Sequence, residues 1–212
     1  MPRARLALAV LLVVPLASLA AQRPITAEQA AAMRTPSNAR VSPSGEWVVY
    51  TVSVPNLEES STNADLWMVA TAGGAPVRLT NHKSMDDQGR WSPDGRSIAF
   101  LSARDGTPQI FRLGLVGGEP EKLTESKTPV GAFAWSPDGT RIAYVAPRDP
   151  TPDEEKKQKG KDDAIVIGKD WVQARLMVLD IASRSATEVA RAEAILDVDW
   201  SPDGRQIAYT VA

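Results

Sequence analysis

The pentapeptide Trp-Ser-Pro-Asp-Gly occurs three times in the 212-residue chain, at Trp91–Gly95, Trp135–Gly139 and Trp200–Gly204, and a degenerate copy occupies Val41–Gly45. Proline presets the first corner of a type I turn, aspartate tolerates the second, and glycine adopts the left-handed conformation that begins the next strand. Each copy therefore predicts a β-hairpin. The residues assigned to these turns are Ser42, Pro43, Gly45, Trp91, Pro93, Asp94, Gly95, Trp135, Pro137, Asp138, Gly139, Trp200, Pro202, Asp203 and Gly204.

The strand that follows each glycine repeats a second pattern. A β-branched residue and an aromatic residue, Ile98 and Phe100 in the second copy, flank a small residue, Ala99. Because successive side chains of a strand point to opposite faces, the two large residues share one face and the small residue lies on the other. We expect a neighbouring sheet to approach closely on the face that carries the small residue.

Two further strands are predicted after each hairpin, separated by turns such as Gly73-Gly74. The strand pairs are Asp65–Val69 with Pro76–Thr80, Gln109–Leu113 with Pro120–Thr124, and Arg175–Asp180 with Ala186–Ala190. Four short strands per unit, with aromatic residues on one face, are typical of a β-propeller blade.

The predicted fold is therefore all-β, a β-propeller of four-stranded blades with about three and a half blades in an incomplete ring and a short N-terminal helix. The blades are expected at about 41–80, 91–124 and 131–190, and an incomplete blade at 196–212. Propellers usually close with roughly four to eight blades. We therefore expect the chain to be the N-terminal part of a longer protein.

Residues 1–20 are predicted to be a signal peptide. Arg3 and Arg5 form a positive n-region, residues 6–16 form an apolar h-region, and small residues precede a cleavage site after Ala20. The apolar run is shorter than the roughly 20 residues of a membrane span, so we expect no stable membrane insertion after signal removal. An uncleaved anchor is the alternative. The protein is expected to be exported, to the periplasm or the extracellular space.

Residues 21–40 are expected to be a helix and a lead-in to the first blade. Thr26 and Gln29 have the spacing of a capping box, which predicts a helix over 25–34 that Pro36 limits. Two later segments are predicted to be loops.

The first predicted loop is the polar segment 56–63, and the second is the charged insert Pro147–Asp170 in the third blade. Prolines at its entry are followed by acidic residues and lysines, which is typical of a solvated, mobile loop. The alternative is a loop that reaches toward a neighbouring domain or subunit.

No catalytic residue is predicted. His82 is the only histidine, and a lone histidine between blades is typical of a surface or packing residue. The chain has no Gly-x-Ser-x-Gly nucleophile elbow, no cysteine, no Cys/His cluster and no Gly-rich phosphate loop, so no metal and no cofactor is expected.

Two pairs of adjacent acids, Asp86-Asp87 and Asp162-Asp163, could suggest shared acid and base chemistry. On extended chain adjacent side chains point to opposite sides, so we do not expect that role. Calcium binding is the alternative, but the other oxygen ligands at fixed spacing are missing.

The tryptophans are interpreted first as packing residues. Trp91, Trp135 and Trp200 share one repeat position, and Trp67 lies in a third strand. Trp171, at the exit of the insert, is either a contact residue or an anchor for the loop.

The motifs Trp-Ser-Pro-Asp-Gly, Ile-Ala-Phe/Tyr and Gly-Gly-x-Pro-x-x-Leu-Thr resemble the WD-like repeats of TolB-like periplasmic proteins and of the propellers of prolyl-oligopeptidase-family serine peptidases. Residues 25–179 look most like the acylaminoacyl- and dipeptidyl-peptidase branch. The segments that favour this branch are Ile25–Gln29, Ala39–Gly45 and the insert 149–163.

This resemblance implies the propeller of a secreted serine peptidase that hydrolyses peptides and selects them by access. The catalytic Ser, Asp and His would lie in an α/β-hydrolase domain missing from this chain, and peptide substrates would bind there. The alternative is a TolB-like periplasmic propeller that binds protein partners without catalysis. Removal of the two n-region arginines would change the formal charge from −2 to −4, and this mild acidity predicts neither nucleic acid nor an anionic membrane as a partner.

Overall fold

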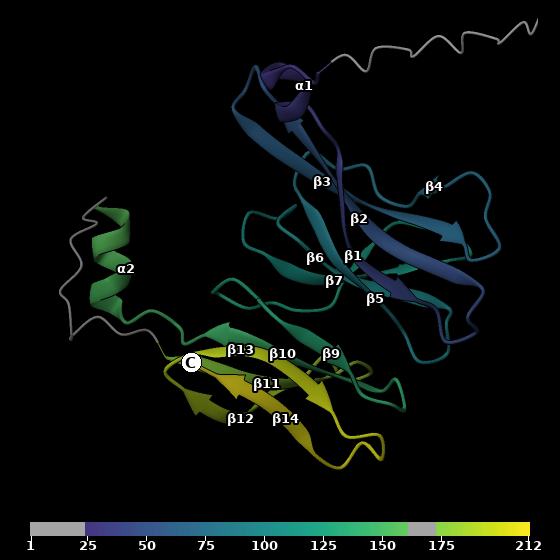
Figure 1. Ribbon diagram of the computed structural model, residues 1–212. Helices are drawn as coiled ribbons and strands as arrows, with labels where there is room; N and C mark the ends of the chain where they lie inside the picture. The colour runs from purple at the N-terminus through teal and green to yellow at the C-terminus, as the bar shows by residue number, and fades with distance from the viewer. Residues whose placement is uncertain (1–23, 161–172) are drawn as a thin grey trace, which may run out of the picture.

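The computed structural model describes residues 24–160 and 173–212, and its strands form successive antiparallel sheets along the chain (Figure 1). Three sheets have four strands each, hydrogen-bonded in chain order, and a two-stranded sheet follows them. The predicted all-β propeller of about three and a half blades is confirmed.

The first blade runs from the lead-in to the first Gly-Gly turn and beyond. Its strands are β1 (Thr35–Val41), β2 (Trp47–Asn56), β3 (Ser61–Ala70) and β4 (Val77–Arg78). Strand β1 thus begins inside the segment expected to be lead-in, and β2 and β3 extend into the segment 56–63 expected to be a loop. Their pairing continues to Asn56 opposite Ser61, so only residues 57–60 join them.

The second and third blades repeat this order. The second blade consists of β5 (Asp86–Trp91), β6 (Ser97–Ser102), β7 (Gln109–Gly114) and β8 (Glu121–Lys122). The third blade consists of β9 (Phe133–Trp135), β10 (Arg141–Pro147), β11 (Ala174–Asp180) and β12 (Ala186–Ala192). The half-blade consists of β13 (Ile195–Trp200) and β14 (Ile207–Val211).

The described part of the chain has two helices, both outside the sheets. Helix α1 (Ala27–Ala31) begins with the predicted capping box, in which Thr26 accepts from the Gln29 amide and the Gln29 side chain accepts from the Thr26 amide. Helix α2 (Pro152–Lys159) lies in the insert, where the sequence predicted only a loop. No helix in the described part of the chain is long and apolar enough to cross a membrane.

The hydrophobic core is divided among the interfaces between successive sheets. Ile98 and Phe100 of β6 pack with Val49 and Leu66 of the first blade, whereas Ala99 on the opposite face packs in the cluster that joins the second blade to the third. A third cluster joins the third blade to the half-blade. The predicted division between a large-residue face and a small-residue face is confirmed. The face that carries the small residues packs against the large residues of the next blade.

The first strands of neighbouring blades contact one another, β1 with β5 and β9 with β13. They therefore lie where the sheets converge, on the side of the propeller axis. The turns after these strands form one end of the blades, which we call the turn end. The opposite end, where second strands join third strands and where α1 and the insert lie, is called the loop end.

Candidate functional site

The repeated turn is held by its serine and aspartate. In the second blade the Ser92 hydroxyl donates to Asp94 Oδ1 over 2.6 Å and accepts from the Ser97 amide over 3.0 Å. Asp94 Oδ1 also accepts from the Arg96 amide over 3.0 Å. The same bonds recur at Ser136 with Asp138 and at Ser201 with Asp203. In the first turn Ser44 stands where the aspartate would be, and its hydroxyl lies 3.2 Å from that of Ser42.

These hydrogen bonds stabilise the ionised carboxylates. The serine hydroxyl, followed by a backbone amide, lowers the pKa of Asp94 and Asp203 and lowers the pKa of Asp138 to about 2. All three carboxylates are bound within their own turns and are therefore structural.

The tryptophans of the motif join neighbouring blades. Trp91 Nε1 donates to the Arg40 carbonyl over 3.0 Å, and Trp135 Nε1 donates to the Arg90 carbonyl over 3.3 Å. Trp200 Nε1 donates to the carbonyl of Ala134 over 3.2 Å. Each acceptor is the residue just before the motif of the preceding blade, so the three bonds form a regular ladder beside the axis.

The turns also stack on one another. Gly139 has φ of +70°, as the left-handed turn position requires, and a Cβ built on it would lie 3.5 Å from Cδ of Pro93 in the preceding turn. The same contact relates Gly95 to Pro43 and Gly204 to Pro137. The motif therefore folds the blades and sets their spacing.

A groove lined by both charged and apolar side chains runs along the first strands, next to the tryptophan ladder. Its lining includes Arg40, Arg90, Trp91, Trp135 and Asp199. Arg40 lies opposite Val49 in β2 and Arg90 lies opposite Ala99 in β6, so both arginines project from the face that receives the next blade. Charged side chains from the first blade, the second blade and the half-blade line this groove.

Charge is unevenly distributed in this groove. Burial and the nearby Arg40 guanidinium lower the pKa of Arg90, while Asp197 and Asp199 of the half-blade act in the opposite direction. The Arg90 guanidinium carbon lies 5.5 Å from the centre of the Phe133 ring, which covers one side of it. Arg90 is therefore close enough to a second cation on β1 and to two carboxylates on β13 for their charges to act on it.

The acid pair Asp86-Asp87 has a structural role, and its two side chains have different partners. Asp86 is fully buried and accepts two 3.0 Å hydrogen bonds from Nη2 of Arg104. Asp87 instead accepts from Asn38 over 2.8 Å and from Thr51 over 2.7 Å, both in the first blade. The two carboxylates therefore bind groups in different blades. In residues 24–160 and 173–212, no group of three or more His, Cys, Asp or Glu side chains is placed to hold a metal ion.

His82 is likewise bound within its own link between blades. Its Nδ1 accepts from the Ser84 amide over 3.0 Å, and its carbonyl accepts from Asn63 Nδ2 over 2.8 Å. The predicted signal peptide, Asp162-Asp163 and Trp171 all lie outside the described residues.

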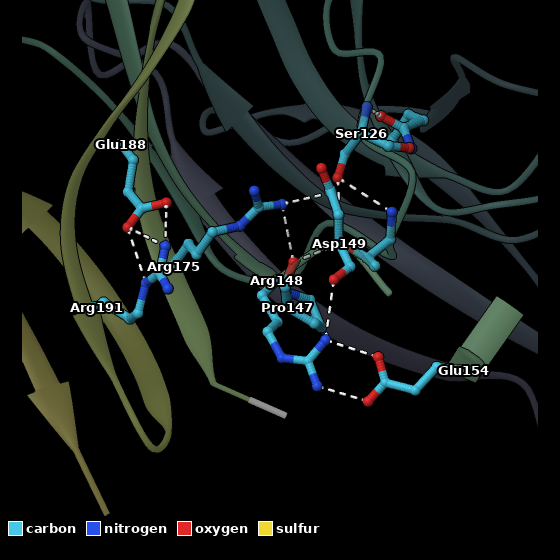
Figure 2. A network of polar contacts seen from close by, with 10 residues as sticks. Ser126, Pro147, Arg148, Asp149, Glu154, Arg175, Glu188 and Arg191 are labelled. Atoms are coloured by element: carbon cyan, nitrogen blue, oxygen red, sulfur yellow. Dashed lines mark hydrogen bonds and ion pairs between the residues drawn. The ribbon is translucent and has the colours of Figure 1, made fainter. Parts of the chain in front are cut away.

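At the loop end, ion pairs fix the base of the insert (Figure 2). The Arg148 guanidinium donates to both carboxylate oxygens of Glu154 in α2, over 2.7 and 2.5 Å. On the returning limb, Arg175 donates to Asp149 Oδ1 over 2.8 Å and to the Pro147 carbonyl over 3.0 Å. These contacts join both limbs of the insert to the third blade and place α2 clear of the sheets (Figure 1).

Helix α2 forms because Thr151 and Glu154 make a second capping box. The Thr151 amide donates to Glu154 over 2.6 Å, and the Glu154 amide donates to the Thr151 hydroxyl over 3.3 Å. Pro152 then occupies the first helical position, and three acids lie in the first turn. The Arg148 guanidinium and the Thr151 amide lower the pKa of Glu154 to about 2. The capping-box spacing of Thr151 and Glu154 is visible in the sequence, but the charged composition of the insert led to the prediction of a loop.

Sequence reasoning also missed Arg40 and Arg90. Both stand immediately before the motif, where the other two copies have Ala134 and Asp199. The variation at this repeat position, from arginine in the first two copies to alanine and aspartate in the others, was the available signal. Its meaning depends on how the first strands converge, which the sequence does not give.

The sequence of residues 61–160 matches the model of the Tricorn protease N-terminal β-propeller domain. No curated protein sequence matches this chain. Among solved structures, the acylaminoacyl peptidase of Pyrococcus horikoshii is 19% identical and superposes with a TM-score of 0.66. The match covers 85% of this chain and 28% of that peptidase chain, so this chain spans less than a third of it.

Two other structures are also similar. The β-propeller domain of the Trilobed protease from Pyrococcus furiosus is 19% identical with a TM-score of 0.52, covering 75% of this chain and 44% of that one. TolB from Acinetobacter baumannii is 17% identical with a TM-score of 0.54, covering 82% of this chain and 48% of that one. The resemblance to peptidase propellers is thus confirmed at the level of the fold, which TolB shares.

Proposed function

We propose that this chain supplies part of the propeller of an exported serine peptidase of the prolyl-oligopeptidase type, which hydrolyses peptides. The observation that carries the proposal is that the blades superpose more closely on the acylaminoacyl peptidase than on TolB. The match to the Tricorn propeller model also favours a peptidase. A propeller fold can host several functions, so the fold by itself assigns no catalysis to these blades. In this proposal a separate α/β-hydrolase domain carries the catalytic residues.

The propeller's role in this proposal is to admit and position the peptide. The groove on the first strands offers charged groups next to tryptophan edges, which suits an extended peptide. The anchored insert at the loop end offers a second contact surface, for a neighbouring domain or subunit. Export is proposed from the n-region, the apolar run and the small residues before Ala20.

The test uses the protein encoded by the complete gene, treated with an active-site-directed fluorophosphonate. We expect covalent labelling of one serine and hydrolysis of N-acylated peptides, because a serine activated by histidine reacts with both. The 212-residue chain alone is the control and should remain unlabelled. A complete gene product that neither labels nor hydrolyses peptides would contradict the proposal.

A TolB-like function is the second candidate, supported by the similarity to TolB over 82% of the chain. In that case the propeller would bind protein partners and would have no catalytic activity. Specific co-purification of a partner with an unlabelled full-length protein would favour this second function.

A further inference from the structure

We propose that Arg40 and Arg90 form a binding site for a peptide carboxylate in the groove along the first strands. The proposal deepens the proposed function, because it names the chemical group that the propeller would bind. It rests on the positions and the partners of these two arginines.

Arg90 carries a donor that its surroundings do not satisfy. Its Nε is buried and has no hydrogen-bond partner among the described residues. A buried donor without a partner is costly and calls for an explanation, which a ligand on the same guanidinium would supply. The Phe133 ring covers one side of the guanidinium, and this contact fixes the plane of the side chain.

Arg40 adds a second cation with little competition from its surroundings. Its guanidinium donates to the carbonyl of Ala39 over 3.2 Å, which leaves further N–H groups for a ligand. Both arginines line a small recess of about 20 Å³, together with Asn38, Gln88 and Gly89. Both also line the adjoining groove of about 290 Å³, which has room for a carboxylate. Two guanidinium groups facing one recess match the paired oxygens of a carboxylate.

The recess owes its shape to two matching irregularities in the strands. The pairing of β1 with β2 shifts between Ser37 and Arg40, and the pairing of β5 with β6 shifts between Asp87 and Arg90. Asn38 and Gln88 lie within these bulges and have φ of 52° and 55°. Bulges in this position re-aim the neighbouring side chains, here the two arginines.

The acidic groups nearby limit which anion can bind. Asp197 and Asp199 of β13 act on Arg90 from across the groove, and Asp199 lines it. Asp87 is already bound by Asn38 and Thr51. These acids offset part of the positive charge, so the groove favours a single carboxylate over a polyanion such as a nucleic acid.

The ladder provides a direct readout. The indole N–H groups of Trp91 and Trp135 donate to the carbonyls of Arg40 and Arg90, so their amide-region NMR signals report on the site. The 22.8 kDa chain is titrated with three probes, acetyl-Ala-Ala-Ala with a free carboxylate, its C-terminal amide, and the amide of acetyl-Ala-Glu-Ala. The second and third probes distinguish a terminal carboxylate from a side-chain carboxylate.

We expect the indole signals of Trp91 and Trp135 to shift with at least one carboxylate probe and not with the neutral amide. Arg90→Gln should weaken binding by about tenfold or more, since a charge-assisted hydrogen bond is lost. Arg40→Gln should weaken it less, and Asp199→Asn should strengthen it by removing a like charge. Lys127→Gln, which removes an exposed charge in a link between blades, is the matched control and should change nothing.

Equal shifts with the neutral amide, or carboxylate binding that survives in a folded Arg90→Gln variant, would overturn the site. Preserved dispersion of the other indole signals shows that each variant is folded. The outcome is separate from that of the labelling experiment. Fluorophosphonate labelling without carboxylate binding would reject this site and leave the peptidase standing, and the converse would leave a peptide-binding propeller without catalysis.

Discussion

At the turn end of the blades four turns share one plan, whereas at the loop end each blade joins its second and third strands differently. The turns repeat the same serine-centred hydrogen bonds, and each stacks a proline of one turn on the glycine of the next. At the loop end a short turn joins β2 to β3, and an insert with its own helix joins β10 to β11. The link between β6 and β7 carries Arg104, which lies against the rings of Phe100 and Phe111. The turn end therefore sets the spacing of the blades, and the loop end is free to vary.

This difference predicts that substitutions at the turn end change the stability of the whole fold, whereas substitutions at the loop end can change function without doing so. Bonds at the turn end join strands of one blade and neighbouring blades, so their loss should affect global unfolding. In the described part of the insert, the ion pairs are made within the insert and at its base, so their loss should remain local. The buried ion pair of Asp86 and Arg104 is an exception, because it lies at the loop end and should still affect global unfolding.

The largest effect is expected for Asp86→Ala, which tests that exception. Arg104 lies against the rings of Phe100 and Phe111, 5.4 and 4.8 Å from their centres, and would keep a buried charge without its partner. Breaking a buried pair in this way typically costs about 3–5 kcal/mol. We expect a loss of that size in the free energy of unfolding, measured by urea denaturation followed by tryptophan fluorescence.

The neighbouring variant Asp105→Ala is the control for this experiment. Asp105 pairs with Lys122 over 3.3 Å and is half exposed, so the expected loss is no more than about 1 kcal/mol. Similar losses of unfolding free energy for Asp86→Ala and Asp105→Ala would show that the buried pair stabilises the fold no more than the exposed pair does.

The turns could be predicted from the sequence because their chemistry is local. Proline, glycine and a serine two residues before an aspartate specify the turn without reference to the rest of the chain. The strand faces could be predicted for the same reason, since alternation in β6 follows from backbone geometry alone. The Asp86–Arg104 pair and the Arg40–Arg90 recess could not be predicted, because their partners are brought together by the packing of strands and sheets.

The second largest effect is expected for Ser136→Ala at the turn end. The Ser136 side chain is fully buried, and its loss would leave the Arg141 amide without its 2.9 Å acceptor. Leaving a buried donor unsatisfied costs about 1–3 kcal/mol. Thermal and urea denaturation should both show this loss.

Ser201→Ala provides the matched comparison, because Ser201 makes the same bonds in the partly exposed turn of the half-blade. Water can replace the lost acceptor there, so a smaller loss is expected. A loss as large as that of Ser136→Ala would mean that the motif acts independently of burial.

A smaller effect is expected from acid. The native pKa of Asp138 is about 2, below the ordinary value of 3.8, so the ionised carboxylate stabilises the fold above pH 3.8. This contribution should fall as pH decreases through that interval and should be lost below about 2. The Asp138→Asn variant should therefore show a shallower decrease in unfolding free energy between pH 5 and 2 than the unmodified chain, as measured by urea titrations at each pH. Identical slopes would show that this carboxylate does not couple the turn to global stability.

The smallest effect on global stability is expected for Glu154→Gln, although the pKa of this carboxylate is also lowered to about 2. Glu154 binds Arg148 and the Thr151 amide, all within the insert, so α2 can open while the blades stay folded. The variant should leave the urea midpoint unchanged while it increases amide hydrogen exchange and proteolytic cleavage in α2. Asp149→Asn, which loosens the Arg175 contact at the base of the insert, should accelerate cleavage in the same segment. A shift of the global midpoint in Glu154→Gln comparable to that of Ser136→Ala would erase the distinction between the two ends, because it would make the insert part of the structure that holds the blades together.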